Sequence, residues 1–178
     1  MKVYVMKKFS LITIVAILIL LTAPVAFAQS TTRYLSIPSS GFTPRASEGS
    51  VGSDAGYDGN QSGTARFFNG SFELFAPVNL PDGVTVNSMR CGGQVLASNR
   101  IRFTLRRNQP QQANVDMATV MSGTGDTGFQ VLDTNSIESP MIDNAPFNYY
   151  IVAQANDFDV GVCPTCSVGF CRIGYTIN

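Results

Sequence analysis

The sequence predicts an all-β protein, an antiparallel β-sandwich of jelly-roll type with about nine or ten short strands. Short segments that alternate apolar and polar side chains recur along most of the chain, and turn residues separate them. Gly, Ser, Thr, Asn and Asp are abundant, whereas Lys and Glu, which favour long polar helices, are scarce. After the N-terminal apolar run, no segment sustains helical apolar spacing without an interrupting Gly or Pro.

The N-terminal residues have the pattern of a secretory signal peptide. Two lysines precede an apolar run from Phe9 to Leu21, and Ala26-Phe27-Ala28 supplies the small-x-small pattern of a cleavage site. The run has about 13 residues, fewer than the roughly 20 that a membrane span needs, so an uncleaved anchor is the less favoured alternative. We expect cleavage of residues 1–28, a secreted or periplasmic protein without a membrane span, and one β-sandwich domain over residues 29–178.

The expected strands follow one another at turn-separated intervals. A first strand, Tyr34 to Ile37, stops at Pro38, and the Gly- and Ser-rich residues 39–63 form a long loop with at most one short strand. The later strands are expected at residues 65–69, 71–78, 84–90, 100–106, 113–121, 129–133, 134–138, 147–155 and 170–177. Asn69-Gly70 is placed as a hairpin turn, and Gly92-Gly93 as a break or bulge.

The clearest expected strand, residues 100–106, places Ile101, Phe103 and Leu105 on one face. An outer-membrane barrel would also show alternation. The cysteine cluster and the absence of two aromatic girdles favour the sandwich.

Charge and residue usage exclude several functions. All three lysines lie within the first 28 residues, so the rest of the chain has nine arginines against twelve acids, a formal charge of −3. That balance provides no basic face for nucleic acid. Histidine, the commonest general base and metal ligand, is absent. We therefore expect a protein that is not an enzyme; the remaining catalytic alternative is a pair of carboxylates, as in glycosidases, and no pattern selects such a pair.

The four cysteines, Cys91, Cys163, Cys166 and Cys171, predict two disulfides, because an even number in an exported chain indicates pairing. One pairing joins Cys91 to Cys171, and others join Cys91 to Cys163 or Cys166; the sequence leaves them open. A redox Cys-x-x-Cys works at a helix N-terminus, whereas this one lies in a Gly- and Pro-containing loop. A zinc site would fit the spacing Cys-x₂-Cys-x₄-Cys but not oxidising conditions.

Two kinds of residue are candidates for ligand binding. Tyr149 and Tyr150 present one ring on each face of their strand, so one could stack on a sugar while the other packs in the core. Weak calcium ligands, which do not match EF-hand spacing, are Asp54, Asp58, Asn60, Asp157 and Asp159. We therefore expect no cofactor, with calcium as the weak alternative.

Three arginines, Arg100, Arg102 and Arg106, share one face of their strand. We expect them to pair with acids of the neighbouring strand, rather than to bind an anionic polymer.

A series of short motifs resembles a group of uncharacterised bacterial secreted β-sandwich proteins. The motifs are residues 75–84 (FAPVNLPDGV), 105–107 (LRR), 142–144 (IDN) with Tyr149-Tyr150, and 172–176 (RIGYT). The resemblance spans Tyr34 to Ile177 and implies the fold, but no established activity.

The expected function is therefore a non-catalytic structural or interaction role at the cell surface, in the periplasm or in the extracellular matrix. The partner would be a protein or a glycan surface, and not nucleic acid. The alternative is a carbohydrate-binding, lectin-like jelly-roll module that uses an exposed Tyr and, in one version, Ca²⁺.

Overall fold

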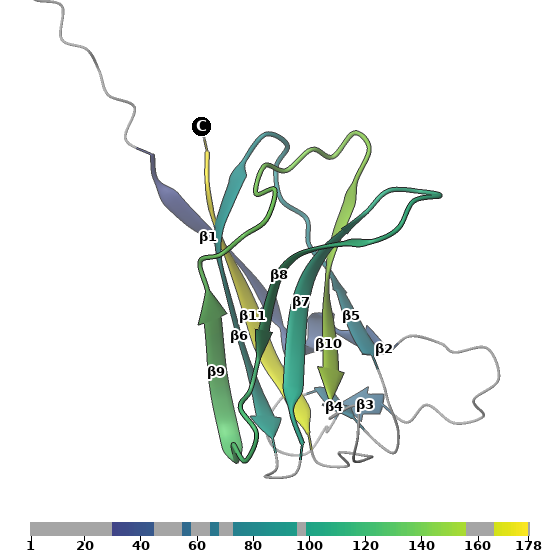
Figure 1. Cartoon of the computed structure of the whole chain (residues 1–178), viewed down its shortest axis with the longest axis vertical. Coiled ribbons are helices and arrows are strands. Elements are labelled where there is room, and N and C mark those ends of the chain that lie inside the picture. Colours follow the sequence, from purple (N-terminus) through teal and green to yellow (C-terminus); the bar gives the residue numbers. More distant parts are fainter. Residues whose placement is uncertain are drawn as a thin grey trace, which may run out of the picture.

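The structure, a computed structural model, describes residues 30–44, 55–57, 65–67, 73–95, 99–155 and 166–177. Two antiparallel sheets pack face to face in this part of the chain (Figure 1), which confirms the predicted all-β sandwich. The one helical element among these residues is a 3-10 turn, η1, at Ser39–Gly41. None of the described residues forms a helix long and apolar enough to cross a bilayer. The expected signal peptide, residues 1–28, lies outside the described residues.

Sheet A has the order β3-β4-β11-β6-β9, with β1 also paired to β11. Its strands are β1 (Thr32–Pro38), β3 (Ala55–Tyr57), β4 (Ala65–Phe67), β6 (Thr85–Val95), β9 (Gly128–Thr134) and β11 (Ser167–Thr176). Sheet B has the order β2-β5-β10-β7-β8. Its strands are β2 (Thr43–Pro44), β5 (Glu73–Pro77), β7 (Ile101–Asn108), β8 (Val115–Met121) and β10 (Asn148–Ala155).

The strand pairings are nested as in a jelly roll. β7 pairs with β8, β6 with β9, and β5 with β10, while β1 and β4 pair with β11, all antiparallel. Eight of the described strands have five residues or more, four in each sheet, and their orders are β1-β11-β6-β9 and β5-β10-β7-β8. This is the architecture of a jelly roll, a double-sheet fold of eight main strands.

The core lies between the sheets and is formed by alternate residues of each strand. On β7, Ile101, Phe103 and Leu105 are almost completely buried, as the sequence pattern predicts. From the opposite sheet, Met89 of β6 and Ile173 of β11 are fully buried in the same cluster. Burial of such side chains contributes about 1.5–3 kcal/mol each and is the main stabilising term of the fold.

Of the predicted hairpin turn and the predicted break or bulge, the first is wrong and the second is correct in part. The two strands on either side of Asn69-Gly70 are not a hairpin, because β4 belongs to sheet A and β5 to sheet B; the dipeptide itself lies outside the described residues. At Gly92-Gly93 the structure has a bulge and no break: β6 continues through both glycines to Val95, and the extra residue, Gly169, belongs to the partner strand β11. Residues 134–138 also do not form a separate strand: β9 ends at Thr134.

One disulfide joins Cys91 of β6 to Cys171 of β11, residues that lie directly opposite each other in neighbouring strands of sheet A. Both side chains are fully buried. Cys166 is disulfide-bonded as well, whereas Cys163 lies outside the described residues. The predicted use of cysteine in disulfides is therefore confirmed for these three residues, and the bridge links two strands of one sheet.

Candidate binding surface

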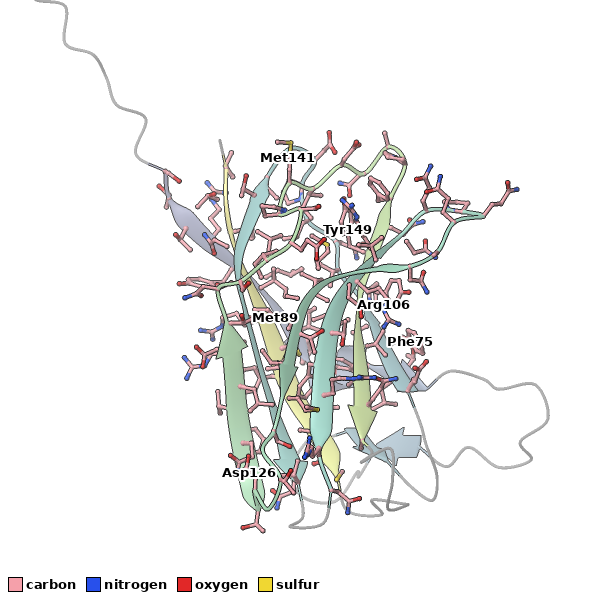
Figure 2. All side chains as sticks on the ribbon, in the orientation of Figure 1. Phe75, Met89, Arg106, Asp126, Met141 and Tyr149 are labelled. Carbon is pink, nitrogen blue, oxygen red and sulfur yellow. A yellow bond between two sulfur atoms is a disulfide. The ribbon has the colours of Figure 1, made fainter. Side chains whose placement is uncertain are left out.

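Tyr149 is part of the core, and its ring is not available for stacking. Its side chain is 5% exposed. The hydroxyl accepts a hydrogen bond from the Asp143 backbone N–H at 2.9 Å and donates one to the Asp143 carbonyl at 3.3 Å. This pattern satisfies the polar end of a buried ring and fixes the loop before β10, near the top of the view in Figure 2. Tyr149 therefore has a structural role.

Tyr150 points to the outer face of sheet B, as strand alternation requires. Its ring is half-buried against Phe75 of β5, with 5.8 Å between the ring centroids. On its other side lies Arg106 of β7 (labelled in Figure 2). Arg106 pairs with Asp116 of β8 at 2.5 Å. The hydrogen bond to Asp116 raises the pKa of Arg106 above its ordinary value and outweighs the opposing effect of partial burial.

The polar side chains of this face are bonded to one another. Gln154 accepts a hydrogen bond from Arg102 Nε at 2.8 Å and donates one to Glu73 at 2.5 Å, so it links three strands. Arg100 donates to the Thr124 hydroxyl. The expected arginine–acid pairing is thus confirmed for Arg106, and Gln154 connects Arg102 to Glu73. The outer face of sheet B thus carries bonded polar side chains beside a half-buried pair of rings.

A groove of about 280 Å³ runs beside the edge strand β8 and contains carboxyl and hydroxyl groups. It is lined by Asp116, Met117, Ala118, Thr119, Thr134, Ser136 and Glu138. Hydrolysis of a glycoside by two carboxyl groups needs one of them held protonated, which an apolar environment achieves. Both acids of this groove are exposed to solvent. The groove therefore lacks the environment that a general acid requires.

The weak calcium candidates, Asp54, Asp58, Asn60, Asp157 and Asp159, all lie outside the described residues. Within the described ranges, no three carboxylate or cysteine side chains come together as a metal site would require.

The outer face of sheet A carries a partly exposed aromatic pair that we call the platform: Phe129 of β9 and Phe170 of β11. Their ring centroids are 6.4 Å apart and the ring planes differ by 24°. Phe129 is 49% exposed, and its neighbour Val131 is 42% exposed. Exposed apolar patches of this kind, beside polar side chains, mark interaction sites in soluble proteins.

Two glycines form the floor of the platform. A Cβ atom at Gly92 would lie 2.6 Å from the Phe170 ring and 2.9 Å from the Phe129 ring. A Cβ at Gly169, the extra residue of a bulge in β11, would lie 2.8 Å from Phe129. Side chains at these positions would push the rings off the sheet. The glycines thus let both rings lie close against the backbone, which holds them in place.

A polar row lies beside the platform on the same face. Asp133, Arg90, Arg172 and Ser36 are register neighbours on β9, β6, β11 and β1, and all four are exposed. The row is two residues, about 7 Å, from the row that contains Phe170. The Arg172 guanidinium lies over the Tyr34 ring, 5.5 Å from its centroid. The platform therefore spans β9, β6 and β11, and the row of hydrogen-bonding groups beside it spans the same three strands and β1.

The sequence contains only a partial signal for the platform. Alternation places Phe129 and Val131 on one face of their strand, and Phe170 opposite to the buried Cys171. It does not show that these strands lie on either side of β6, or that Gly92 faces both rings. Those facts depend on the pairing of residues far apart in the chain.

Comparison with known proteins identifies a fold but no family. No protein-family model matches the sequence, and a search of curated proteins finds no match. Among solved structures, the chain is similar to the "xylan-binding module CBM15", with a TM-score of 0.51 and 11% identity over 83% of this chain and 97% of that one.

Two further solved structures are similar. The CBM36-1 domain of a multidomain xylanase from the hindgut metagenome of Trinervitermes trinervoides has a TM-score of 0.49 at 11% identity, over 79% of this chain and 96% of that one. CsCBM6-3 from Clostridium stercorarium, in complex with cellobiose, has a TM-score of 0.45 at 11% identity, over 77% and 90%. At 11% identity, the likeness to the xylan-binding module, whose TM-score is 0.51, supports the β-sandwich fold alone.

Proposed function

We propose that the protein is an exported, non-catalytic module that binds a polysaccharide across the outer face of sheet A. The observation that carries this proposal is the platform: two rings stacked on a glycine floor, with one of them half exposed to solvent. A pyranose ring has a face of C–H groups that can lie on an aromatic ring, while its hydroxyls need hydrogen-bonding partners beside it. The platform and the adjacent polar row offer both.

The choice of a glycan over another ligand has a second support. The structure with the highest TM-score of those described above is named a xylan-binding module, so xylan is the first polymer to test. The exposed carboxyl groups of the β8 groove favour binding over hydrolysis. The four platform residues have no side-chain oxygen that could bind a cation, so we expect binding to persist in EDTA. The broader role of an interaction protein at the cell surface or in a matrix includes this activity.

The test is affinity electrophoresis in gels that contain soluble xylan, followed by calorimetry. Phe129→Ala should weaken binding by about tenfold or more, equivalent to about 1.4 kcal/mol, because it removes the exposed ring. Gly92→Ala should also weaken binding, since its methyl group displaces both rings without removing either one. Circular dichroism would show that each variant is folded.

Phe75→Ala is the matched control, because Phe75 is also a partly exposed ring on a strand but belongs to the outer face of sheet B. It should bind like the wild type. If Phe75→Ala or Tyr150→Ala abolished binding while Phe129→Ala did not, the site would be on sheet B. Absence of binding to xylan, cellulose and β-1,4-galactan alike would refute the proposal, and release of sugar from these polymers would refute its non-catalytic part.

A further inference from the structure

β9 is the last of the described strands of sheet A, and within the described ranges no strand pairs with its outer edge. It pairs with β6 through seven consecutive residue pairs without a bulge. In Figure 1, β9 lies at the left margin of the sandwich, with no labelled strand beyond it. Apart from the ladder to β6, no backbone hydrogen bond among the described residues involves Gly128–Thr134. An open edge of this kind is a template for another strand.

The other long edges of the described sheets are protected in ways that β9 is not. β8 has a register shift opposite Leu105 and Arg106, and its Met117 carbonyl accepts a hydrogen bond from the Glu138 N–H at 2.7 Å. β1 contains Arg33 and ends at Pro38. β9, with the sequence GFQVLDT, has no proline and no bulge, and its one charged residue, Asp133, lies next to the end of the strand. Charged side chains, proline and bulges are the features that normally prevent edge pairing.

The register of the sheet shows which backbone groups of β9 face the open edge. The Cα atoms of Cys91 and Cys171 are 4.1 Å apart, the spacing of a pair that does not exchange backbone hydrogen bonds. The N–H and C=O of Cys91 therefore point away from β11 and bond to Leu132 of β9. Along a strand, the backbone N–H and C=O groups of successive residues point to opposite edges. The N–H and C=O of Phe129, Val131 and Asp133 therefore point to the open edge.

We propose that two copies of the protein pair through this edge, β9 against β9, antiparallel about a two-fold axis at Val131. In that register Val131 bonds to its own counterpart, and Phe129 of each copy bonds to Asp133 of the other, so all six outward N–H groups find carbonyl acceptors. The edge is thus complementary to itself, as a two-fold interface requires. The two Asp133 side chains lie at opposite ends of the interface, so like charges do not meet.

The Phe129 ring does not obstruct this pairing, since it lies over Gly92 and Gly169, away from the edge. The axis is perpendicular to the sheet, so both platforms lie on the same face of one continuous sheet. Five strand spacings, roughly 24 Å, would separate the two copies of Phe170. If the platform binds a glycan, as proposed above, the pair would bind a long polymer at two points; the pairing itself does not depend on that function.

Amide hydrogen exchange by NMR, on the purified protein without glycan, tests the register directly. The Gln130, Leu132 and Thr134 amides bond to β6 and should be protected at every concentration. The Phe129, Val131 and Asp133 amides should become protected only as the concentration rises. No substitution is needed, so a folding defect cannot confuse the result. Equal exchange of these three amides at low and high concentration would overturn the proposal.

Sedimentation velocity on variants provides the second test. Val131→Lys places two ammonium groups next to each other at the axis and should raise the dimer dissociation constant at least about tenfold. Met121→Lys is the matched control, because Met121 is 47% exposed and lies on the edge strand of the other sheet; it should leave the dimer intact. A wild-type monomer at all concentrations, equal effects of the two variants, or assemblies larger than a dimer would each refute two-fold pairing.

Discussion

Removal of the Cys91–Cys171 bridge is expected to destabilise the protein severely. The two residues are 80 positions apart, and for a loop of that length the chain-entropy model assigns about 4.5 kcal/mol to the cross-link. Domains of this size are stable by about 5–15 kcal/mol in total. The bridge is therefore expected to account for a large fraction of the free energy of unfolding.

The double substitution Cys91→Val/Cys171→Val isolates this contribution. Both cysteine side chains are fully buried, and two opposed valines refill most of their volume, so the loss of packing is kept small. We expect the free energy of unfolding to fall by about 4 kcal/mol, which corresponds to a shift of the urea midpoint by about 2 M for an m-value near 2 kcal/mol/M. The m-value should rise, because the unfolded chain is no longer cross-linked.

Urea unfolding followed by circular dichroism, with linear extrapolation, measures both quantities. The double alanine variant is the companion: it loses the cross-link and also leaves a cavity, so it should be less stable than the double valine variant. A double valine variant within about 1 kcal/mol of the wild type would refute the reasoning, since the cross-link would then contribute little. The bridge also lies beside Gly92 and Phe170, so its loss should loosen the platform.

Two further substitutions test the polar contacts. Tyr149→Phe should cost about 1–2 kcal/mol in urea unfolding, because the Asp143 N–H loses its acceptor, whereas Tyr150→Phe on the outer face should cost less; equal costs would contradict the assignment. Arg106→Gln should cost less than about 1 kcal/mol, because the pair with Asp116 is solvent-exposed, and high salt should reduce the difference. Because the pKa of Arg106 is raised in the folded state, Arg106 contributes fully to stability at any pH below its pKa in the unfolded chain. The contribution is lost only as the pH rises through the folded-state pKa, so titration of Arg106 should leave stability unchanged near neutral pH.

The sequence was most informative where structure is local. Alternation along residues 101–105 correctly places three apolar side chains in the core, because the direction of a side chain in a strand depends only on its position along the strand. The cysteine count and the expected export signal together predict disulfides, and the bridge between Cys91 and Cys171 is one of the pairings left open. The same reasoning could not identify the pairing, since that requires knowing which strands are neighbours.

The predictions that failed depended on local signals that tertiary structure overrode. Asn-Gly usually marks a hairpin, yet the strands on either side of residues 69–70 pair in different sheets. Gly92-Gly93 suggests a break or a bulge; a bulge is present, but its extra residue is Gly169 of β11, and β6 continues with partners on both sides. Gly92 lies where two aromatic rings cross the strand, a requirement that no local window of sequence contains.

The sequence by itself therefore determined the fold class, the inward faces of the strands and the use of cysteine, because each follows from composition or from a period of two residues. Only the tertiary structure decided the location of the candidate site. The platform combines Phe129, Phe170, Gly92 and Gly169, and the open edge depends on β9 being last in its sheet. Both features arise from contacts between strands that lie far apart in the chain, and such contacts leave no pattern within any one strand.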